Sequence, residues 1–433
     1  DALATAETPV RSGPEIFLPD RKNSRGWDLT HRPELDDIEK ARAPYRTARV
    51  SAGPILAREV EGSSPKPRPN PADPSDIVGD LAEATARDVE TALAAATPWD
   101  APAAERAAVL ERAAELYEKN FGKLFALAAR EAGKSLLDSV GELREAADFL
   151  YYYARQAQSL DRPARGVFTC ISPWNFPLAI FTGQIAGALA AGNGVLAKPA
   201  EQSPLIAHAA VELLHEAGVP KTALQLLPGD GAKVGAALTS DPRVNGVAFT
   251  GSTETARIIR RAMAEHLDPG APLIAETGGL NAMIVDSTAL AEQAVRDIVQ
   301  SAFQSAGQRC SALRCLYVQE DVAESLKEML FGAMEALTLG DPWHLSTDVG
   351  PVIDADAQGD IAGYIETARH EGLVLKTLAA PKDGHFIAPT VIAVPGIRAL
   401  EREVFGPVLH LATYRAEDLD RVIEEINATG YGL

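Results

Sequence analysis

Cysteine, basic residues and long apolar runs are all scarce in this sequence, and each shortage excludes a class of protein. Only three cysteines occur among 433 residues, an odd number that describes no disulfide framework and favours a reducing compartment. They are Cys170, Cys310 and Cys315. Because no second pair of Cys or His follows the last two at ligand spacing, we expect no metal site.

Positive charge is also in deficit. The chain has 41 Lys and Arg against 60 Asp and Glu, which gives a formal net charge of -19. A surface of this average sign repels phosphate backbones and anionic lipid headgroups, so we expect neither nucleic acid nor a membrane as a partner. An anionic ligand would need a local cationic site or the N-terminus of a helix.

No segment is expected to direct secretion or to cross a membrane. The first residues, DALATAETPV, lack the basic and apolar regions of a secretory signal. The longest apolar stretch, residues 178–197, contains Gln184 and Asn193 and is rich in Gly and Ala. It therefore predicts a buried helix, a turn and a strand. Together with the scarce cysteines, these features favour a cytoplasmic location.

What is present is a globular composition with an α/β pattern. Hydrophobic residues make up 46% of the chain and charged residues 23%, and the length suits two or three cores. Residues 1–75, rich in Pro and charge, predict an extended arm or linker. Residues 76–275 pass from long helices into strands that alternate with helices, which predicts a Rossmann-like parallel sheet with a nucleotide site at its carboxyl edge. Residues 276–433 predict a second α/β domain, which contains Cys310.

Cys310 is the candidate nucleophile. It follows Arg309 and the end of a predicted helix at Gly307, so a cation and backbone N–H groups could stabilise its thiolate. A lone cysteine is more often an inert core residue, and on the residues alone this alternative stays open. Cys170 and Cys315 lie inside apolar strand-like runs, and we interpret both as packing residues.

Two polar side chains follow predicted strands. Glu276 ends the run PLIAE, just before TGG, and a partly desolvated carboxylate there could act as a general base on water. Asn175 lies between two prolines in SPWNFP, where a rigid amide could donate to a developing oxyanion. A solvated turn glutamate and an ordinary loop asparagine are the alternatives.

Three further pairs leave predicted strands with groups that suit a nucleotide. Backbone N–H groups and a hydroxyl suit a pyrophosphate, whereas a carboxylate suits ribose hydroxyls and disfavours a 2′-phosphate. Taken singly, each pair is most often surface chemistry. The pairs are Gly251 with Ser252, Lys198 with Glu201, and Glu403 with Phe405.

Six motifs together resemble the aldehyde dehydrogenase superfamily in order and spacing. They are SPWNFPLAIFTGQ, LAKPAEQSP, FTGSTETA, ETGG, GQRC and EVFGP, between residues 172 and 407. The stretch PDRKNSRGWDL and wordings such as RCSALR are most similar to the dehydrogenase module of the bifunctional proline utilisation A (PutA) family. The resemblance implies the aldehyde dehydrogenase fold and NAD-dependent oxidation of L-glutamate γ-semialdehyde, formed from pyrroline-5-carboxylate, to L-glutamate in proline catabolism.

The resemblance also implies roles for individual residues. Cys310 would attack the aldehyde and carry a thiohemiacetal and then a thioester. Asn175 and the Cys310 N–H would hold the oxyanion, and Glu276 would activate the hydrolytic water. Ser311 resembles a position that contacts the amino-acid end of the substrate. The residues implied for NAD are Trp174, Gly251 and Ser252 at the pyrophosphate, Lys198 and Glu201 at the adenosine ribose, and Glu403 and Phe405 at the nicotinamide end.

Two departures from the family concern assembly and substrate binding. Only DRPAR stands near residues 160–166, where the family inserts a β-hairpin used for oligomerisation. The chain stops at Leu433, before the family's glycine-rich loop that anchors the substrate, and it does not begin with Met. We therefore expect a piece of a longer protein, in which a flavin-dependent proline dehydrogenase module would be a partner. A homo-oligomer remains open.

Two other functions stay open at this point. The first is an NAD-dependent dehydrogenase for another aldehyde, such as succinic semialdehyde or a betaine-type aldehyde. The second is a non-catalytic scaffold module that walls a channelling chamber or supports assembly. Cys310, Asn175 and Glu276 argue against a scaffold, because a scaffold needs none of them.

Overall fold

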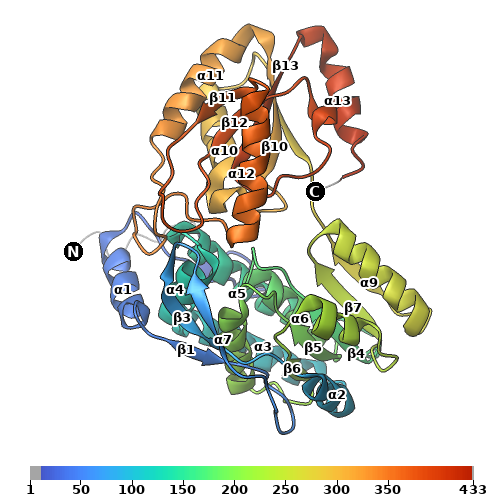
Figure 1. Cartoon of the computed structure of the whole chain (residues 1–433). Coiled ribbons are helices and arrows are strands. Elements are labelled where there is room, and N and C mark those ends of the chain that lie inside the picture. Colours follow the sequence, from blue (N-terminus) through green and yellow to red (C-terminus); the bar gives the residue numbers. More distant parts are fainter. Residues whose placement is uncertain (1–10, 432–433) are drawn as a thin grey trace.

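A parallel sheet of five strands lies at the centre of the lower domain in Figure 1. In the computed structural model, which describes residues 11–431, its strand order is β6–β5–β4–β7–β8. The bounds are β4 (Val167–Ile171), β5 (Gly194–Lys198), β6 (Leu224–Leu226), β7 (Gly246–Thr250) and β8 (Leu273–Glu276). All neighbours pair in parallel, so their carboxyl ends share one edge. The order reverses between β4 and β7, and open α/β sheets bind ligands at such a point.

Helices cover both faces of this sheet. Successive side chains of a strand point to opposite faces, and here both faces carry apolar side chains that must be buried. Phe168 and Cys170 of β4 pack with one helical layer, and Val167 packs with the other. The first layer comprises α3 (Ala103–Lys119), α4 (Phe121–Ala132), α5 (Leu136–Ala157), α6 (Ala179–Ala190) and α7 (Pro204–Ala217). The second comprises α2 (Ala86–Ala95), α8 (Ala236–Thr239) and α9 (Thr253–His266). The predicted alternation of strands and helices is confirmed.

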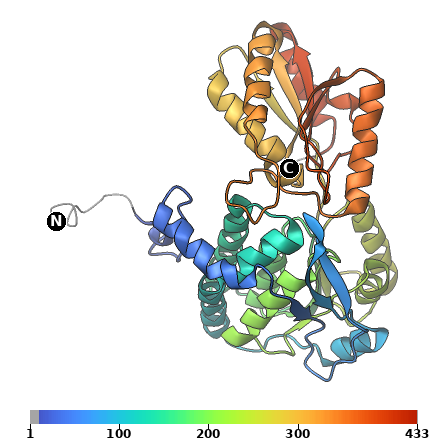
Figure 2. The same cartoon turned by 60° about the vertical axis from the view of Figure 1, so that its left-hand side comes forward.

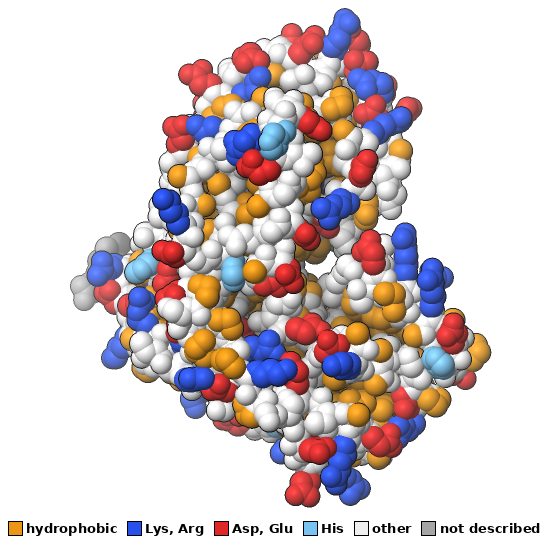
Figure 3. All heavy atoms as spheres, in the orientation of Figure 1, with side chains coloured by type: hydrophobic (Ala, Val, Ile, Leu, Met, Phe, Trp, Pro, Cys, Tyr) orange, Lys and Arg blue, Asp and Glu red, His pale blue; other side chains and the backbone are white. Residues whose placement is uncertain are grey.

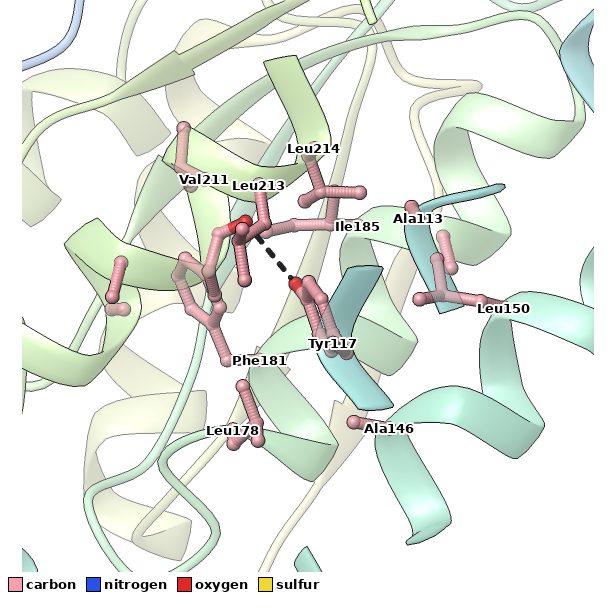
Figure 4. Packing of buried hydrophobic residues seen from close by; sticks show 14 of the residues in the cluster. Ala113, Tyr117, Ala146, Leu150, Leu178, Phe181, Ile185, Val211, Leu213 and Leu214 are labelled. Atoms are coloured by element: carbon pink, nitrogen blue, oxygen red, sulfur yellow. Dashed lines mark hydrogen bonds between the residues drawn. The ribbon is translucent and has the colours of Figure 1, made fainter. Parts of the chain in front are cut away.

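The core of the first layer is largely apolar, and the hydroxyl of Tyr117 is one of the few polar groups buried in it. In Figure 4, Ala146 of α5 and Ile185 of α6 lie near the ring of Tyr117 on α3. Tyr117 is fully buried, and its hydroxyl donates to the carbonyl of Ala210 on α7 at 3.3 Å. Because a buried hydroxyl needs a partner, this bond fixes how α3 and α7 pack.

The apolar stretch at residues 178–197 forms α6, a turn and β5, as predicted. Most residues of α6 are buried, and Gln184, which is only partly buried, donates from Nε2 to the hydroxyl of Thr250 at 3.0 Å. Within residues 11–431, no helix combines the length and the apolar character that a membrane span requires.

A left-handed glycine separates α4 from α5. Gly133 has φ +65°, and a Cβ on it would lie 2.8 Å from Cγ of Pro351, so both conformation and space favour glycine. Ser135 then caps α5 by accepting from the N–H of Asp138 at 3.3 Å. This turn presents the buried side chain of Lys134 to both domains.

The N-terminal region packs along the flank of the lower domain (Figure 2). α1 (Arg32–Arg42) lies against α4, and the rings of Trp27 and Phe125 meet edge-on with centroids 5.1 Å apart. A separate sheet follows, formed by β1 (Val50–Ala52), β2 (Lys66–Asn70) and β3 (Asp73–Leu81). β3 runs through residue 75, where we expect the arm to end, and that boundary stays a prediction.

The upper domain in Figure 1 contains a second sheet of five strands, in the order β11–β12–β13–β10–β9. β11 runs antiparallel to β12, and the other pairs are parallel. Its strands are β9 (Asn281–Val285), β10 (Leu313–Gln319), β11 (Val374–Thr377), β12 (Thr390–Ala393) and β13 (Val408–Tyr414). One face carries α10 (Ala291–Phe303), α11 (Glu320–Glu335) and α12 (Ala355–His370), and the other carries α13 (Leu419–Asn427). The expected boundary between residues 275 and 276 falls at the end of β8 and stays a prediction.

Candidate active site

Cys310 lies between two cavities at the junction of the two domains. One cavity, of about 460 Å³, has Trp174 and Phe405 in its wall. The other, of about 890 Å³, has Phe149 and Ile180 in its wall. Cys310 belongs to the lining of both. The space-filling view shows the surface hollowed between the two domains (Figure 3). The two cavities therefore meet at Cys310.

The Cys310 thiol is half-buried, and its surroundings disfavour the thiolate. Burial raises the pKa of Cys310, the carboxylate of Glu403 raises it further, and Glu276 adds to this effect. The backbone N–H groups of Ser311 and of Cys310 itself lower it. The thiol is therefore not preset as a thiolate, and ionisation depends on the charges that surround it.

The prediction that Arg309 stabilises the thiolate is wrong. Nη2 of Arg309 lies 2.9 Å from Oδ1 of Asp138, a buried carboxylate in the first turn of α5. The same guanidinium lies 5.9 Å from the centre of the Phe176 ring. The positive charge of Arg309, which was predicted to stabilise the Cys310 thiolate, is neutralised by the carboxylate of Asp138 instead.

Asn175 lies on the loop after β4, at the point where the strand order reverses. Its side chain is buried, and Nδ2 donates to the carbonyl of Gln308 at 3.0 Å. Gln308 precedes Cys310 by two residues, so the amide is held beside the backbone of the nucleophile. Among residues 11–431 this amide has no second acceptor, which leaves one N–H to donate to a ligand.

Glu276 is the last residue of β8, and it lines the larger cavity together with Cys310. The residue is exposed, so the expected partial desolvation of its carboxylate is wrong. β8 is an edge strand of its sheet, and Ile274 on the same strand is 57% exposed. The carboxylate is consequently open to water on the same side as the thiol.

The smaller cavity combines features that suit a dinucleotide. Gly251 and Ser252 form the turn from β7 into α9, and both line the cavity. The N–H groups of a first helical turn and the helix dipole favour phosphate. The rings of Trp174 and Phe405 meet edge-on, with centroids 5.5 Å apart, and give the cavity a flat aromatic wall.

The paired glycines of the ETGG motif make room for Glu403. A Cβ on Gly278 would overlap Oε2 of Glu403, and the N–H of Gly279 donates to this oxygen at 3.2 Å. Oε1 of the same carboxylate lies 2.8 Å from Nη2 of Arg314. Burial raises the pKa of Glu403, although Arg314 opposes this shift. The carboxylate is thus fixed at the wall of the smaller cavity.

Lys198 and Glu201 pair with each other after β5. Nζ of the buried lysine lies 2.9 Å from Oε1 of Glu201, and the N–H of Gly231 donates to the same oxygen at 2.5 Å. Neither residue lines the two cavities that Cys310 joins. Lys198 is level with Ile171 of β4, so the pair lies on the same sheet edge as the Asn175 loop.

Ser311 is exposed beside Cys310 and lines neither cavity. Its contact with substrate stays a prediction. Cys170 and Cys315, by contrast, are buried in strands, where burial raises the pKa of each to about 12, as suits packing residues. In the described part of the chain, no cluster of three or more His, Cys, Asp or Glu residues could hold a metal ion.

Comparison with known proteins identifies the family. Residues 60–433 match the aldehyde dehydrogenase family over most of the chain. The chain belongs to the aldehyde dehydrogenase family. This confirms the resemblance carried by the six motifs and the expected aldehyde dehydrogenase fold.

Relatives within the aldehyde dehydrogenase family narrow the comparison. The bifunctional protein PutA of Escherichia coli (strain K12) is 50% identical over 447 residues, which cover 97% of this chain and 34% of that protein. The crystal structure of Bradyrhizobium japonicum proline utilization A superposes with a TM-score of 0.87 at 45% identity, over 100% of this chain and 43% of that one. The 1-pyrroline-5-carboxylate dehydrogenase from Thermus, solved with bound NAD, has a TM-score of 0.84 at 32% identity, over 97% and 84% of the chains. The chain spans about a third of the length of the PutA protein it matches.

Two polar residues of this aldehyde dehydrogenase site were missed by the sequence reasoning. Asn281 donates from Nδ2 to the carbonyls of Cys310 at 2.7 Å and Ala312 at 2.9 Å, which fixes the backbone of the nucleophile. Gln184 lines the larger cavity, and its Oε1 is buried with no partner in the described residues. Gln184 carried a signal, because a polar residue in an apolar helix usually meets a polar partner.

Two buried cations of the aldehyde dehydrogenase site were also missed. Arg314 lies within the apolar strand β10 and donates to the carbonyls of Gly307 at 2.7 Å and Arg309 at 2.9 Å as well as to Glu403. Lys134 follows α4 and is equally buried. A cation inside an apolar run predicts a buried ion pair, but the run does not reveal the partner.

Proposed function

We propose that this chain catalyses the NAD-dependent oxidation of L-glutamate γ-semialdehyde to L-glutamate in proline catabolism. The observation that carries the proposal is the position of Cys310, which is shared by a cavity suited to a dinucleotide and a second cavity that contains Glu276. A relative named 1-pyrroline-5-carboxylate dehydrogenase supports this substrate, because pyrroline-5-carboxylate is in equilibrium with the semialdehyde.

The smaller cavity fits the phosphate and nicotinamide end of NAD. Gly251 and Ser252 would hold the pyrophosphate with Trp174, and Glu403 would accept from the nicotinamide ribose, with Phe405 beside the ring. When bound, NAD supplies the acceptor for the hydride that leaves the substrate carbon. The NAD found in the Thermus relative supports this assignment.

Lys198 and Glu201 would hold the adenosine ribose. They lie at the carboxyl end of β5, next to the strand that leads into the Asn175 loop. The carboxylate of Glu201 would accept from ribose hydroxyls and repel a 2′-phosphate, which favours NAD over NADP. Lys198 and Gly231 both donate to Oε1 of Glu201, and among the described residues this leaves Oε2 to accept from a ribose hydroxyl.

Cys310 begins the chemistry from the larger cavity. After the thiol has released its proton to solvent water, the sulfur forms a bond to the aldehyde carbon, the carbonyl π bond breaks, and the carbonyl oxygen becomes an oxyanion. The free N–H of the Asn175 amide and the N–H of Cys310 would donate to that oxygen. After oxidation, the acyl group is a thioester on the sulfur of Cys310.

Glu276 would complete the turnover. Its carboxylate takes a proton from a water molecule, whose oxygen adds to the thioester carbon. Collapse of the resulting tetrahedral species breaks the bond to sulfur and releases the carboxylate product. The exposure of Glu276 on the thiol side of the larger cavity supports this role, because the base must reach both water and the acyl group.

The similarity to known relatives supports two further parts of the proposal, a partner module and the division into domains. The PutA relatives are named bifunctional, and this chain covers 34% of one of them, so we propose a flavin-dependent proline dehydrogenase module in the same protein. We also propose a cofactor domain over residues 76–275 and a catalytic domain over residues 276–433, with Ser311 at the amino-acid end of the substrate.

The experiment that tests the proposal follows NADH formation by the purified protein with L-glutamate γ-semialdehyde. We expect turnover by the wild type and none by Cys310→Ala, while Cys310→Ala still binds NAD. A panel with succinic semialdehyde and betaine aldehyde measures specificity by kcat/KM. A best substrate without the α-amino acid group would replace the semialdehyde, and silence with every aldehyde would favour the scaffold function.

A further inference from the structure

The segment that leads to Cys310 has an unusual backbone. Ser305, Ala306 and Gly307 are all left-handed, with φ of 57°, 53° and 66°. Two of the three are not glycine, and such residues keep this conformation only where the surrounding structure holds them. The turn at residues 305–307 therefore depends on contacts from other elements.

Lys134 supplies one of these contacts. The residue is 2% exposed, and Nζ donates to the hydroxyl of Ser305 at 2.9 Å. The same nitrogen donates to the backbone carbonyl of Asn175. One buried ammonium thus joins the turn before the nucleophile to the loop that carries the candidate oxyanion donor.

Glu142 fixes the ammonium in turn. Its Oε1 lies 3.8 Å from Nζ of Lys134, and its Oε2 accepts from the N–H groups of Leu178 at 3.1 Å and Ala179 at 2.9 Å. These N–H groups begin α6, directly after the Asn175 loop. Lys134 therefore holds the Asn175 loop to the turn at residues 305–307, and Glu142 holds the start of α6, where this loop ends. The attraction between the two charges offsets the free-energy cost of burying each of them.

Lys134 touches neither candidate ligand site. It is absent from the linings of the two cavities that Cys310 joins, whereas Asn175, whose backbone carbonyl it contacts, lines the smaller of them. The side chain amide of Asn175 donates to Gln308, and the backbone of Asn175 is held by Lys134, so two links fix this residue relative to residues 305–310. Removing Lys134 breaks the link that crosses from Asn175 to Ser305.

We propose that Lys134 is a positioning residue that sets the Asn175 amide against the Cys310 thiol, so that both meet the same carbonyl carbon and oxygen. This proposal rests on the function proposed above. A positioning role differs from a merely stabilising ion pair because Lys134 acts through Asn175. Loss of Lys134 should therefore not slow the reaction further in a variant that already lacks the Asn175 side chain.

The test is a double-mutant cycle of Lys134→Met and Asn175→Ala. Acylation is measured with a p-nitrophenyl ester, where the sulfur of Cys310 bonds to the acyl carbon and p-nitrophenolate leaves. This assay needs neither NAD nor the proposed aldehyde, so it remains informative if the proposed substrate is wrong. We expect each single variant to slow acylation by about 100-fold, as loss of an oxyanion donor does, and the double variant to be no slower than Asn175→Ala.

Arg130→Met is the matched control. Arg130 is a buried cation in the last turn of α4, four residues before Lys134, but its partners are Asp76 and the carbonyls of Tyr45 and Ala48, and none of these three residues lines a cavity that Cys310 joins. We expect it to lower the unfolding midpoint as Lys134→Met does, with acylation within about twofold of the wild type. Equal slowing by Arg130→Met would assign the Lys134 effect to general destabilisation and overturn the proposal.

Ser305→Ala covers the case in which Lys134→Met does not fold. It removes the hydroxyl that accepts from Nζ and leaves the Asn175 carbonyl, the ammonium and Glu142 in place. We expect a smaller loss, of about tenfold in acylation, which again disappears in the Asn175→Ala background. Additive effects of Asn175→Ala with either variant, or unchanged acylation in both, would overturn the positioning role.

Discussion

The buried guanidinium of Arg314 pairs with the half-buried carboxylate of Glu403, at a distance of 2.8 Å between Nη2 and Oε1. The same guanidinium donates to the carbonyl of Gly307, three residues before Cys310. One side chain therefore holds both the carboxylate at the wall of the smaller cavity and the turn that leads to the thiol. A displacement of Arg314 would therefore move both the Glu403 carboxylate and the backbone before Cys310.

Arg314→Met should weaken NAD binding and destabilise the protein. It leaves the Glu403 carboxylate half-buried without its cation, and breaking a buried pair costs about 3–5 kcal/mol. Urea unfolding measures the loss of stability, and calorimetry measures the NAD dissociation constant. Arg314→Lys keeps the charge but loses the forked geometry, so we expect an intermediate value. Unchanged NAD affinity in a folded Arg314→Met protein would contradict the role given to this pair.

Thiol reactivity should depend on the charge of Glu403. A neighbouring negative charge disfavours the thiolate and raises the pKa of Cys310, so removing that charge lowers it. Glu403→Gln should therefore shift the pH profile of iodoacetamide alkylation, measured without NAD, to lower pH. Cys170 and Cys315 serve as internal controls, because burial raises their pKa to about 12 and they should stay unmodified in the folded protein. A profile that moves to higher pH would reverse the assigned sign.

Glu276→Gln should separate acylation from hydrolysis. The amide cannot take a proton from water, but the attack by Cys310 does not require this carboxylate. We expect about one equivalent of NADH to form rapidly per active site, followed by turnover slowed by about 10²–10⁴-fold. Rapid-mixing absorbance measures both phases, and mass spectrometry detects the acyl group on the protein. Loss of the rapid phase would instead place Glu276 in the first half of the reaction.

Gly278→Ala should damage the cofactor side without unfolding the protein. The new methyl group would overlap Oε2 of Glu403 and force the carboxylate to move. We expect a rise in KM for NAD with little change in the unfolding midpoint. Gly141→Ala is the control, since Gly141 lies in α5 with nothing within 4 Å of a Cβ there. That variant should keep its KM and gain up to about 1 kcal/mol of stability from the better helix former.

Local sequence patterns predicted the elements better than they predicted the charges. The strand that ends at Glu276 and the turn at Gly251 follow from apolar runs and glycine, which act over a few neighbouring residues. Arg309 shows the limit: its adjacency to Cys310 suggested a cation for the thiolate, but its partner Asp138 lies 171 residues away in the chain. The partners of Lys134 and Arg314 are set in the same way by tertiary packing, which no local pattern encodes.

The candidate site is divided between the two domains. Asn175 lies on the loop after β4 and Glu276 ends β8, both of the lower sheet. Cys310 and Glu403 lie on the segments that lead into β10 and β13 of the upper sheet. Neither sheet alone contains a complete set of groups, so the chemistry exists only while the two bodies stay in register. The catalytic rate therefore reports whether the two domains keep their relative position. A low denaturant concentration that loosens the junction should abolish activity, while the hydrophobic core of each domain and the circular dichroism signal stay unchanged.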